Sequence, residues 1–372
     1  MRVAINTLAM GHKLYGVGNY IKHLVASLSK LDAQNEYLLF ASRENAHHLQ
    51  DLGGNFRIQY GPGSRSLRLP WEQTILPLRL KRERIDLYHG PTFVTPLLKT
   101  SRQVVSIHDM TFHLTPERHS LHKRIYFRAM IPKAIRRSDA IIAVSESTKR
   151  DLLRLLEIEE ESKISLVPLG VDSRFYPRTD EAELAGVRKK YGLPPKFILF
   201  VGMIEPRKNL RTLVEAYESA GLANDFELVV AGSLGWNYEA LLRQIARSPV
   251  GHRIRMPGYV ADADLPALYS LATVFVYPSL YEGFGLPVLE AMACGVPVIT
   301  SDISSLPEVA ADAGVLFDPS SSQALASVLQ RVLGSGELRQ LLSERGRQRA
   351  RLFTWELTAQ KTLAAYAGTV AL

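Results

Sequence analysis

Cysteine is nearly absent from this chain of 372 residues, which contains a single one, Cys294. One cysteine cannot form a disulfide within the chain or a cysteine-based metal centre. Long apolar runs are also lacking, because no stretch approaches the roughly 18 residues that a membrane-spanning helix needs. The opening residues MRVAINTLAM lack the basic and apolar regions of a secretory signal peptide. We therefore expect a cytoplasmic protein, either free or bound at the inner surface of the cytoplasmic membrane.

Acidic clusters of the kind that hold metal ions are scarce as well. Asp262 and Asp264 have the D-x-D spacing that can bind Mg²⁺ or Mn²⁺ beside a diphosphate. Asp264 also stands directly before the helical pattern that begins at Leu265, where aspartate is a common N-terminal cap. We favour the cap over the metal site, and expect neither a metal nor a cofactor.

Positive charge is concentrated in the first half of the chain. Residues 1–180 contain 27 Lys and Arg against 18 Asp and Glu, whereas residues 181–372 contain 18 against 19. Two basic clusters account for much of this excess: Arg65, Arg68, Arg79, Lys81, Arg82 and Arg84 around Trp71, and Lys123, Arg124, Arg128, Lys133, Arg136 and Arg137 among Tyr126, Phe127, Met130 and Ile131. Basic amphipathic stretches favour an anionic membrane surface, and a solvated helix face is the alternative. The pI of 9.4 alone does not indicate nucleic-acid binding, because no recognition motif accompanies it.

Short apolar segments alternate with amphipathic ones along most of the chain, which predicts parallel sheets covered by helices. Expected strands are residues 2–6, 37–40, 56–60, 86–89, 104–107, 140–144, 197–202, 227–231, 274–277 and 298–301; expected helices include 20–31, 209–220, 238–247, 323–333, 337–352 and 355–366. The alternation stops at residues 165–177, where Pro, Gly and Asp suggest a linker. We expect an α/β fold with domains at 1–173 and 174–354, and a closing helix at about 355–372 that packs back onto the first domain.

The most informative stretch is Glu282-Gly-Phe-Gly-Leu-Pro-Val-Leu-Glu290, between an apolar strand and a short helix that begins at Pro287 and ends before Gly295. Glycines in the turn let a ligand approach the backbone, and the amides at the helix start favour an anion. Two carboxylates, Glu282 and Glu290, flank this anion site and can accept hydrogen bonds from hydroxyl groups. We expect Glu282 to lie in a loop without a packing role; an ordinary helix start with one exposed and one capping glutamate is the alternative.

Other loops that follow expected strands carry polar residues. Gly16 and Gly18 follow the first strand, but Ile21 replaces the third glycine of a dinucleotide-binding fingerprint. His108 and Asp109 follow the strand at residues 104–107, at the edge of a parallel sheet where ligands bind. Arg207 and Lys208 stand at the expected start of a helix, where cations oppose the helix dipole unless an anion is held there.

Together these motifs resemble the retaining GT-B glycosyltransferases of family GT4, in the branch of mannosyltransferase B. The matching segments are GVGNY (16–20), HDMTF (108–112), AVSESTKRDL (143–152), VGMIEPRKNL (201–210), AGSLGW (231–236) and PSLYEGFGLPVLEAMACGVPVITSDISSLPEVAADAG (278–314). The resemblance implies two Rossmann-like domains that face each other across a cleft, with acceptor binding by the first and nucleotide-sugar binding by the second. One departure is Met203, where many relatives have an arginine that binds phosphate.

The resemblance also implies roles for individual residues. Arg207 and Lys208 would hold the donor diphosphate, Glu282 the sugar hydroxyls and Glu290 the ribose. Backbone amides at Gly283, Phe284, Gly285 and Leu286 would bind donor oxygens, with Gly16 near the donor, and His108 would approach the reacting carbon.

The expected reaction is metal-independent transfer of a hexose, mannose from GDP-mannose, with retention of configuration. The expected acceptor is a glycan, carried on a membrane lipid, in the synthesis of a cell-surface polysaccharide such as O-antigen. Transfer from a UDP- or dTDP-sugar, such as glucosyl or rhamnosyl transfer, is one alternative. A sugar-nucleotide epimerase of similar fold is another, although no proton-abstracting set of residues is evident for it.

Overall fold

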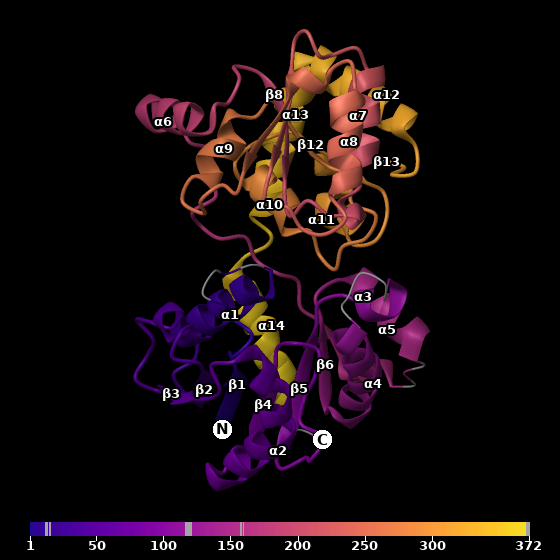
Figure 1. The fold of residues 1–372 in the computed structure, drawn as a ribbon. Coiled ribbons are helices and arrows are strands. Elements are labelled where there is room, and N and C mark those ends of the chain that lie inside the picture. The colour runs from indigo at the N-terminus through magenta and orange to yellow at the C-terminus, as the bar shows by residue number, and fades with distance from the viewer. Residues whose placement is uncertain (12–13, 15, 116–120, 157, 159, 370–372) are drawn as a thin grey trace. The chain divides into compact units, whose positions relative to one another are not determined.

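The computed structural model describes residues 1–11, 14, 16–115, 121–156, 158 and 160–369. The chain divides into two compact units, unit 1 with Met1–Gly170 and Thr354–Leu372, and unit 2 with Val171–Phe353 (Figure 1). Each unit is built around one parallel sheet with helices on its faces, so the predicted α/β architecture is confirmed. The sequence places the boundary after residue 173, and the structure divides the chain after Gly170 and again after Phe353.

Unit 1 contains a seven-stranded parallel sheet with the order β3-β2-β1-β4-β5-β6-β7. The strands are β1 (Arg2–Asn6), β2 (Glu36–Ala41), β3 (Phe56–Tyr60), β4 (Leu87–Gly90), β5 (Arg102–Ile107), β6 (Ala140–Ala143) and β7 (Ile164–Leu166). Strands after β1 extend the sheet in one direction and strands after β4 extend it in the other. The carboxyl ends of β1 and β4 therefore form a switch point, which is where ligands bind in sheets of this type.

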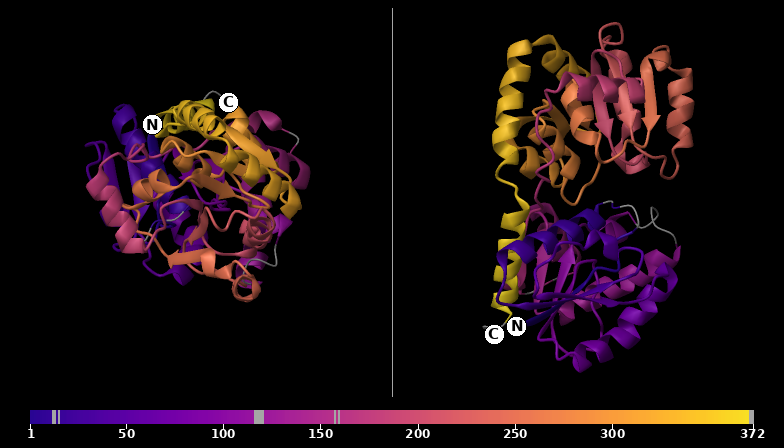
Figure 2. Two further views of the ribbon diagram at one scale, coloured as in Figure 1. Left: turned by 90° about the horizontal axis from the view of Figure 1, so that it is seen from above. Right: turned by 90° about the vertical axis from the view of Figure 1, so that its left-hand side faces the viewer.

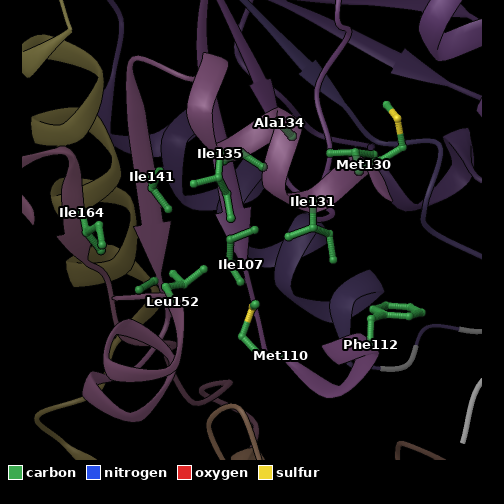
Figure 3. Packing of buried hydrophobic residues seen from close by; sticks show 13 residues of the cluster. Ile107, Met110, Phe112, Met130, Ile131, Ala134, Ile135, Ile141, Leu152 and Ile164 are labelled. Carbon is green, nitrogen blue, oxygen red and sulfur yellow. The ribbon is translucent and has the colours of Figure 1, made fainter. Parts of the chain in front are cut away.

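Helices cover both faces of this sheet. Helix α1 (Val17–Leu31) packs beside the closing helix α14 (Trp355–Gly368), which returns from the far end of the chain (Figure 2). Helices α2 (Arg65–Arg82) and α4 (Leu121–Arg137) bury apolar side chains against strands. Figure 3 shows Ile131 and Ile135 of α4 beside Ile107 and Ile141 of the sheet. The short α3 (Thr111–Leu114) and α5 (Glu146–Leu156) complete the layer.

Unit 2 contains a six-stranded parallel sheet with the order β10-β9-β8-β11-β12-β13. The strands are β8 (Phe197–Val201), β9 (Glu227–Ala231), β10 (Ile254–Gly258), β11 (Val274–Tyr277), β12 (Val298–Ser301) and β13 (Gly314–Phe317). The helices are α6 (Glu181–Tyr191), α7 (Leu210–Ser219), α8 (Glu239–Arg247), α9 (Leu265–Leu271), α10 (Leu286–Ala293), α11 (Leu306–Ala310), α12 (Ser322–Gly334) and α13 (Gly336–Ala350). Here the switch point lies at the carboxyl ends of β8 and β11.

Three strands, β7, β10 and β13, were not expected from the sequence. β7 has only three residues and begins the segment interpreted as a linker, so the linker prediction is wrong at that end. β10 contains Pro257 and ends in Gly258 at the edge of its sheet, where the missing amide of proline costs little. Among the described residues, no helix is long and apolar enough to cross a membrane.

Candidate functional site

Polar side chains from two loops meet at the switch point of unit 2. One loop follows β8 and forms a turn of 3-10 helix at Pro206–Lys208, and the other follows β11 and leads into α10. Because β8 and β11 are adjacent strands, both loops leave the sheet at the same edge. Arg207, Lys208 and Glu282 are thereby brought together from positions far apart in the sequence.

Glu282 is the counter-ion of both cations. Its Oε1 lies 2.6 Å from Nζ of Lys208, and its Oε2 lies 2.7 Å from Nη1 of Arg207. Nη1 of Arg207 also donates to the Tyr281 carbonyl at 2.7 Å, and Nη2 lies 2.8 Å from Oε1 of Glu205. The Tyr277 hydroxyl contacts both Lys208 and Glu282. The result is a compact network of two cations and two carboxylates.

Burial and charge determine the ionisation of this network. Burial by itself would raise the pKa of Glu282, but Lys208 and Arg207 outweigh it and lower that pKa to about 2. Burial lowers the pKa of Lys208, and Glu282 partly opposes this effect. Glu282 also raises the pKa of Arg207 against the effect of burial. Glu282 and Arg207 are therefore both charged at neutral pH.

The network corrects two expectations from the sequence. Glu282 was expected in a loop without a packing role, but it is 9% exposed and accepts bonds from two cations. Arg207 and Lys208 were expected to conflict with a helix start until an external anion arrives. Their charge is instead balanced within the protein by Glu282 and Glu205, so any bound anion must compete with these carboxylates.

The turn after Glu282 is held rigidly. The Ser305 hydroxyl lies 2.7 Å from the Phe284 carbonyl and 3.0 Å from the Glu282 carbonyl, so its one hydrogen is shared between them. Gly285 has a φ of +109°, and a Cβ there would lie 2.8 Å from Leu306 Cδ2, so glycine is required. Helix α10 then begins at Leu286 without a side-chain cap. Pro287 has no amide hydrogen and the Val288 amide bonds the Gly285 carbonyl at 3.0 Å, so the Leu286 amide is the one at the helix start that can bond an anion. Gly283 lies in the same turn.

Glu290 lies in the second turn of α10, and its Oε2 accepts a 2.9 Å hydrogen bond from the Tyr269 hydroxyl. Burial raises the pKa of Glu290 to about 7, although the bond from Tyr269 partly offsets this effect. The carboxyl group therefore exchanges its proton near neutral pH. Glu282 and Glu290 thus differ strongly in acidity, although both flank the same glycine turn.

His108 and Gly16 belong to unit 1. Nε2 of His108 lies 2.8 Å from the Pro91 carbonyl, and since a carbonyl can only accept, Nε2 carries the hydrogen. Burial lowers the pKa of His108, so the ring is neutral and its Nδ1 is an acceptor. The Tyr20 ring meets it edge-on with centroids 4.7 Å apart. Gly16, with a φ of +36°, directly precedes α1, the helix that carries Tyr20.

The D-x-D segment is used for structural contacts. Asp264 occupies the N-terminal cap position of α9, but its side chain does not bond the helix amides as expected. Its Oδ2 instead accepts bonds from Lys190 and Tyr191 of α6, both at 2.6 Å. Asp262 accepts a 3.3 Å bond from the Tyr259 hydroxyl. Among the described residues, no three His, Cys, Asp or Glu side chains gather in a group that could hold a metal ion.

Only some side chains of the two basic clusters in unit 1 are exposed to solvent. Arg68 is not part of a basic surface, because its Nε lies 2.7 Å from the buried Glu72. Met130 and Ile131 face the core, so they are not the apolar side of a membrane-binding face. The exposed basic side chains of α4 are Arg128, Lys133, Arg136 and Arg137. The side chains of Arg65 and Lys123 lie outside the described residues.

Comparisons with known proteins agree with this geometry. The family model of glycosyl transferases group 1 matches residues 187–349, and that of glycosyltransferase family 4 matches residues 15–175. O-antigen chain mannosyltransferase B of Escherichia coli is 32% identical over 98% of this chain and 99% of its own length. The chain belongs to the GT4 glycosyltransferases.

Further relatives support the fold of this glycosyltransferase. The MMP α-(1→4)-mannosyltransferase of Mycolicibacterium hassiacum is 32% identical over 68% of this chain and 60% of its own length. Sucrose-phosphate synthase of Thermosynechococcus elongatus superimposes with a TM-score of 0.79 at 23% identity, over 100% of this chain and 99% of that one. The GT-B fold expected from the sequence is therefore confirmed.

Several residues of the network were missed by sequence reasoning. Glu205 binds Arg207, and its Oε2 accepts a 3.1 Å bond from the Trp236 indole. Tyr277 and Tyr269 contact Glu282 and Glu290 through their hydroxyls. Glu205 had a sequence signal, because it stands two residues before Arg207. Tyr277 and Tyr269 had no such sequence signal, since their segments show only the pattern of a buried strand and a buried helix.

Proposed function

We propose that this glycosyltransferase moves mannose from GDP-mannose to a lipid-linked glycan, with retention of configuration and without a metal ion. The observation that carries the proposal is the Arg207–Lys208–Glu282 network at the switch point of unit 2. A nucleotide diphosphate sugar presents a diphosphate and a hydroxylated ring close together. The network offers cations for the first and a carboxylate for the second.

When the donor binds, its diphosphate replaces Glu282 as the negatively charged partner of Arg207 and Lys208. Without donor, Glu282 balances Lys208 at 2.6 Å and Arg207 at 2.7 Å. The diphosphate takes over as the partner of these cations and releases the Glu282 carboxylate toward the sugar hydroxyls. The Leu286 amide at the start of α10 adds a further donor for the phosphate oxygens. Glu205 stays bonded to Arg207 and keeps its guanidinium in place.

The same cations favour cleavage of the glycosyl–phosphate bond. As the bond from C1 to the phosphate oxygen breaks, negative charge grows on the diphosphate, and nearby fixed cations stabilise it. The acceptor hydroxyl forms the new bond to C1 on the same face and transfers its proton to the leaving phosphate oxygen. Glu282 and Glu290 are assigned to hydroxyl groups, which leaves no carboxylate pair for double displacement. Neutral His108 approaches the transferred sugar as a hydrogen-bond partner.

We propose mannose as the transferred sugar because similar proteins are mannosyltransferases by name. O-antigen chain mannosyltransferase B matches nearly the whole chain, and the Mycolicibacterium hassiacum relative also has a mannosyltransferase name. A lipid-linked acceptor in O-antigen synthesis fits the exposed cations of α4. Leu121 and Ile125, at 67% and 62% exposure, lie on the same helix and add apolar contact for a bilayer surface. Such binding places the enzyme on the cytoplasmic side of the membrane as a peripheral protein.

A donor panel tests this proposal. Purified enzyme is incubated with a lipid-linked glycan acceptor and GDP-mannose, UDP-glucose or dTDP-rhamnose, with and without excess EDTA. We expect mass spectrometry to show one added hexose with GDP-mannose alone, at the same rate in EDTA, and NMR to show an α-linked product from the α-configured donor. Transfer from another donor would overturn the sugar assignment, and loss of activity in EDTA that Mg²⁺ restores would overturn the metal-free mechanism.

A further inference from the structure

A cavity lies in unit 2 between the first turns of α7 and α8. Its volume is about 420 Å³, within the roughly 300–1,000 Å³ typical of small-molecule sites. The lining residues are Ile204, Glu205, Pro206, Asn209, Leu210, Arg211, Thr212, Glu215, Asn237, Tyr238, Ala240 and Leu241. Figure 1 shows α7 and α8 side by side on one face of the sheet.

This cavity is distinct from the proposed donor site. Its lining includes none of Arg207, Lys208, Glu282, Glu290 or the turn at residues 283–286. Glu205 alone belongs to both places, because it lines the cavity and also bonds Arg207. The cavity is therefore adjacent to the donor network without sharing its cations.

The lining has an apolar floor and a mixed polar rim. Ile204, Leu210 and Leu241 are 2%, 3% and 5% exposed, and form the apolar part. Around them the rim offers a guanidinium from Arg211 and a carboxylate from Glu215. The Asn237 amide and the Tyr238 hydroxyl add neutral donors and acceptors. Charges of both signs make the rim a poor match for either a strong anion or a strong cation.

A sugar ring has the matching character. Its C–H face packs on apolar side chains, while each hydroxyl both donates and accepts a hydrogen bond. The Glu215 carboxylate, the Arg211 guanidinium and the Asn237 amide around an apolar floor satisfy such a ligand. The charge of Glu205, the other carboxylate of the lining, is already balanced by Arg207. We propose that the cavity between α7 and α8 is a second saccharide-binding site, separate from the donor site and specific for neutral sugars.

Glu205 links this site to the donor network. Its Oε1 accepts from Arg207 and its Oε2 accepts from the Trp236 indole at 3.1 Å. A saccharide that hydrogen-bonds Glu205 changes how firmly this carboxylate holds Arg207. Sugar binding in the cavity therefore changes the environment of both the Trp236 indole and the Arg207 guanidinium. This coupling rests on the proposed function, whereas saccharide binding itself does not.

NMR titration of the full-length, ¹⁵N-labelled protein with mannobiose tests the site. We expect shift changes at the Asn237 and Tyr238 amides and at the Trp236 indole, and we expect mannobiose still to bind in saturating GDP, with an affinity changed only through Glu205. Arg211→Gln and Tyr238→Ala should each weaken mannobiose binding about tenfold, as for one lost hydrogen bond. Thermal unfolding of each variant checks that it is folded.

Arg243→Ala is the matched control, because Arg243 lies on α8 outside the cavity lining and is exposed. Its mannobiose affinity should equal that of the wild type. The proposal is overturned if shifts are confined to residues 282–290, if GDP displaces mannobiose, or if the control loses as much affinity as Arg211→Gln. Absence of any shift in the presence of excess mannobiose overturns it as well. None of these outcomes bears on transfer from GDP-mannose, so the donor proposal stands or falls separately.

Discussion

Glu282 has two tasks that follow from one position. It neutralises the buried Lys208 and the half-buried Arg207, and in the proposed mechanism the donor releases it to the sugar hydroxyls. A carboxylate whose pKa is lowered to about 2 by Lys208 and Arg207 stays ionised at every physiological pH. The protein therefore balances these two cations with its own carboxylate, and in the proposed mechanism the donor diphosphate replaces this carboxylate as their negative partner.

Glu282→Ala should abolish transfer and also destabilise the fold, because it leaves two buried cations without their partner. We expect the free energy of unfolding to fall by about 3 kcal/mol, as for a buried ion pair that loses one member. Urea unfolding measures this loss. Glu282→Gln keeps the shape of the side chain but loses the charge, and should also abolish transfer. Unchanged stability of the alanine variant would show that Glu282 is not the counter-ion described here.

Glu290 predicts a pH dependence of stability. Its pKa of about 7 lies above the ordinary value of 4.5, so the folded state binds more protons than the unfolded state between these values. The contribution of Glu290 to the free energy of unfolding is therefore complete below pH 4.5 and is lost as the pH rises to 7. Urea midpoints of wild type and Glu290→Gln at pH 5, 6, 7 and 8 test this. Their difference should change with pH in that window, and a constant difference would contradict the shift.

The sequence predicted the members of the site better than their contacts. The glycine turn and the helix start drew attention to Glu282, Glu290, Arg207 and Lys208, because local backbone chemistry is visible in a sequence. The structure brings Glu282, Arg207 and Lys208 into contact, and their binding of an anion stays a prediction. The pairing of Glu282 with Lys208 depends on the adjacency of β8 and β11, which is a property of the folded sheet. The buried tyrosines that complete the network could not be separated from core residues for the same reason.

At the scale of elements, α14 is tied to the sheet of unit 1 by a buried polar chain. The Tyr366 hydroxyl of α14 lies 2.7 Å from Nδ1 of His89 in β4. Nε2 of His89 lies 2.7 Å from the Ser106 hydroxyl, which also bonds the Tyr20 hydroxyl of α1 at 2.9 Å. Burial, with a smaller effect of His108, lowers the pKa of His89 to about 3, so this chain is neutral.

Tyr366→Phe should lower the free energy of unfolding by about 1 to 3 kcal/mol, because it leaves a buried nitrogen of His89 without a partner. Urea unfolding followed by circular dichroism measures the change. Tyr60→Phe is the control, since Tyr60 is 51% exposed and its change should be within about 0.5 kcal/mol of zero. Equal effects of the two substitutions would show that the bond to His89 does not stabilise α14.

Helices and strands with a clear periodicity of apolar residues were predicted within a few residues of their bounds. Short or irregular elements were not. β9 and β11 agree residue for residue with the prediction because apolar residues follow one another along them. β13 has only four residues and begins at Gly314, and β10 is half-exposed at a sheet edge. Such strands form because a neighbouring strand offers backbone partners, and this information is absent from the local sequence.

At the scale of the whole molecule, the charge split predicts reversible membrane binding. The exposed cations of α4 should attract anionic lipids by on the order of 1 kcal/mol each, and salt should screen them. Replacing the exposed Arg128, Lys133, Arg136 and Arg137 with Gln should lower sedimentation with anionic liposomes and leave donor hydrolysis nearly unchanged. If the wild-type protein does not sediment with these liposomes at low salt, the basic face is only a solvated surface and the acceptor is a soluble sugar.

Isothermal titration with GDP and guanosine tests most directly whether Arg207 and Lys208 form the donor diphosphate site. Arg207→Ala and Lys208→Ala should each weaken GDP binding by about 1.5 to 3 kcal/mol, roughly ten- to a hundredfold, and leave guanosine binding unchanged. Arg243→Ala should bind both ligands as the wild type does. Equal losses for GDP and guanosine in folded Arg207→Ala and Lys208→Ala proteins would contradict the account.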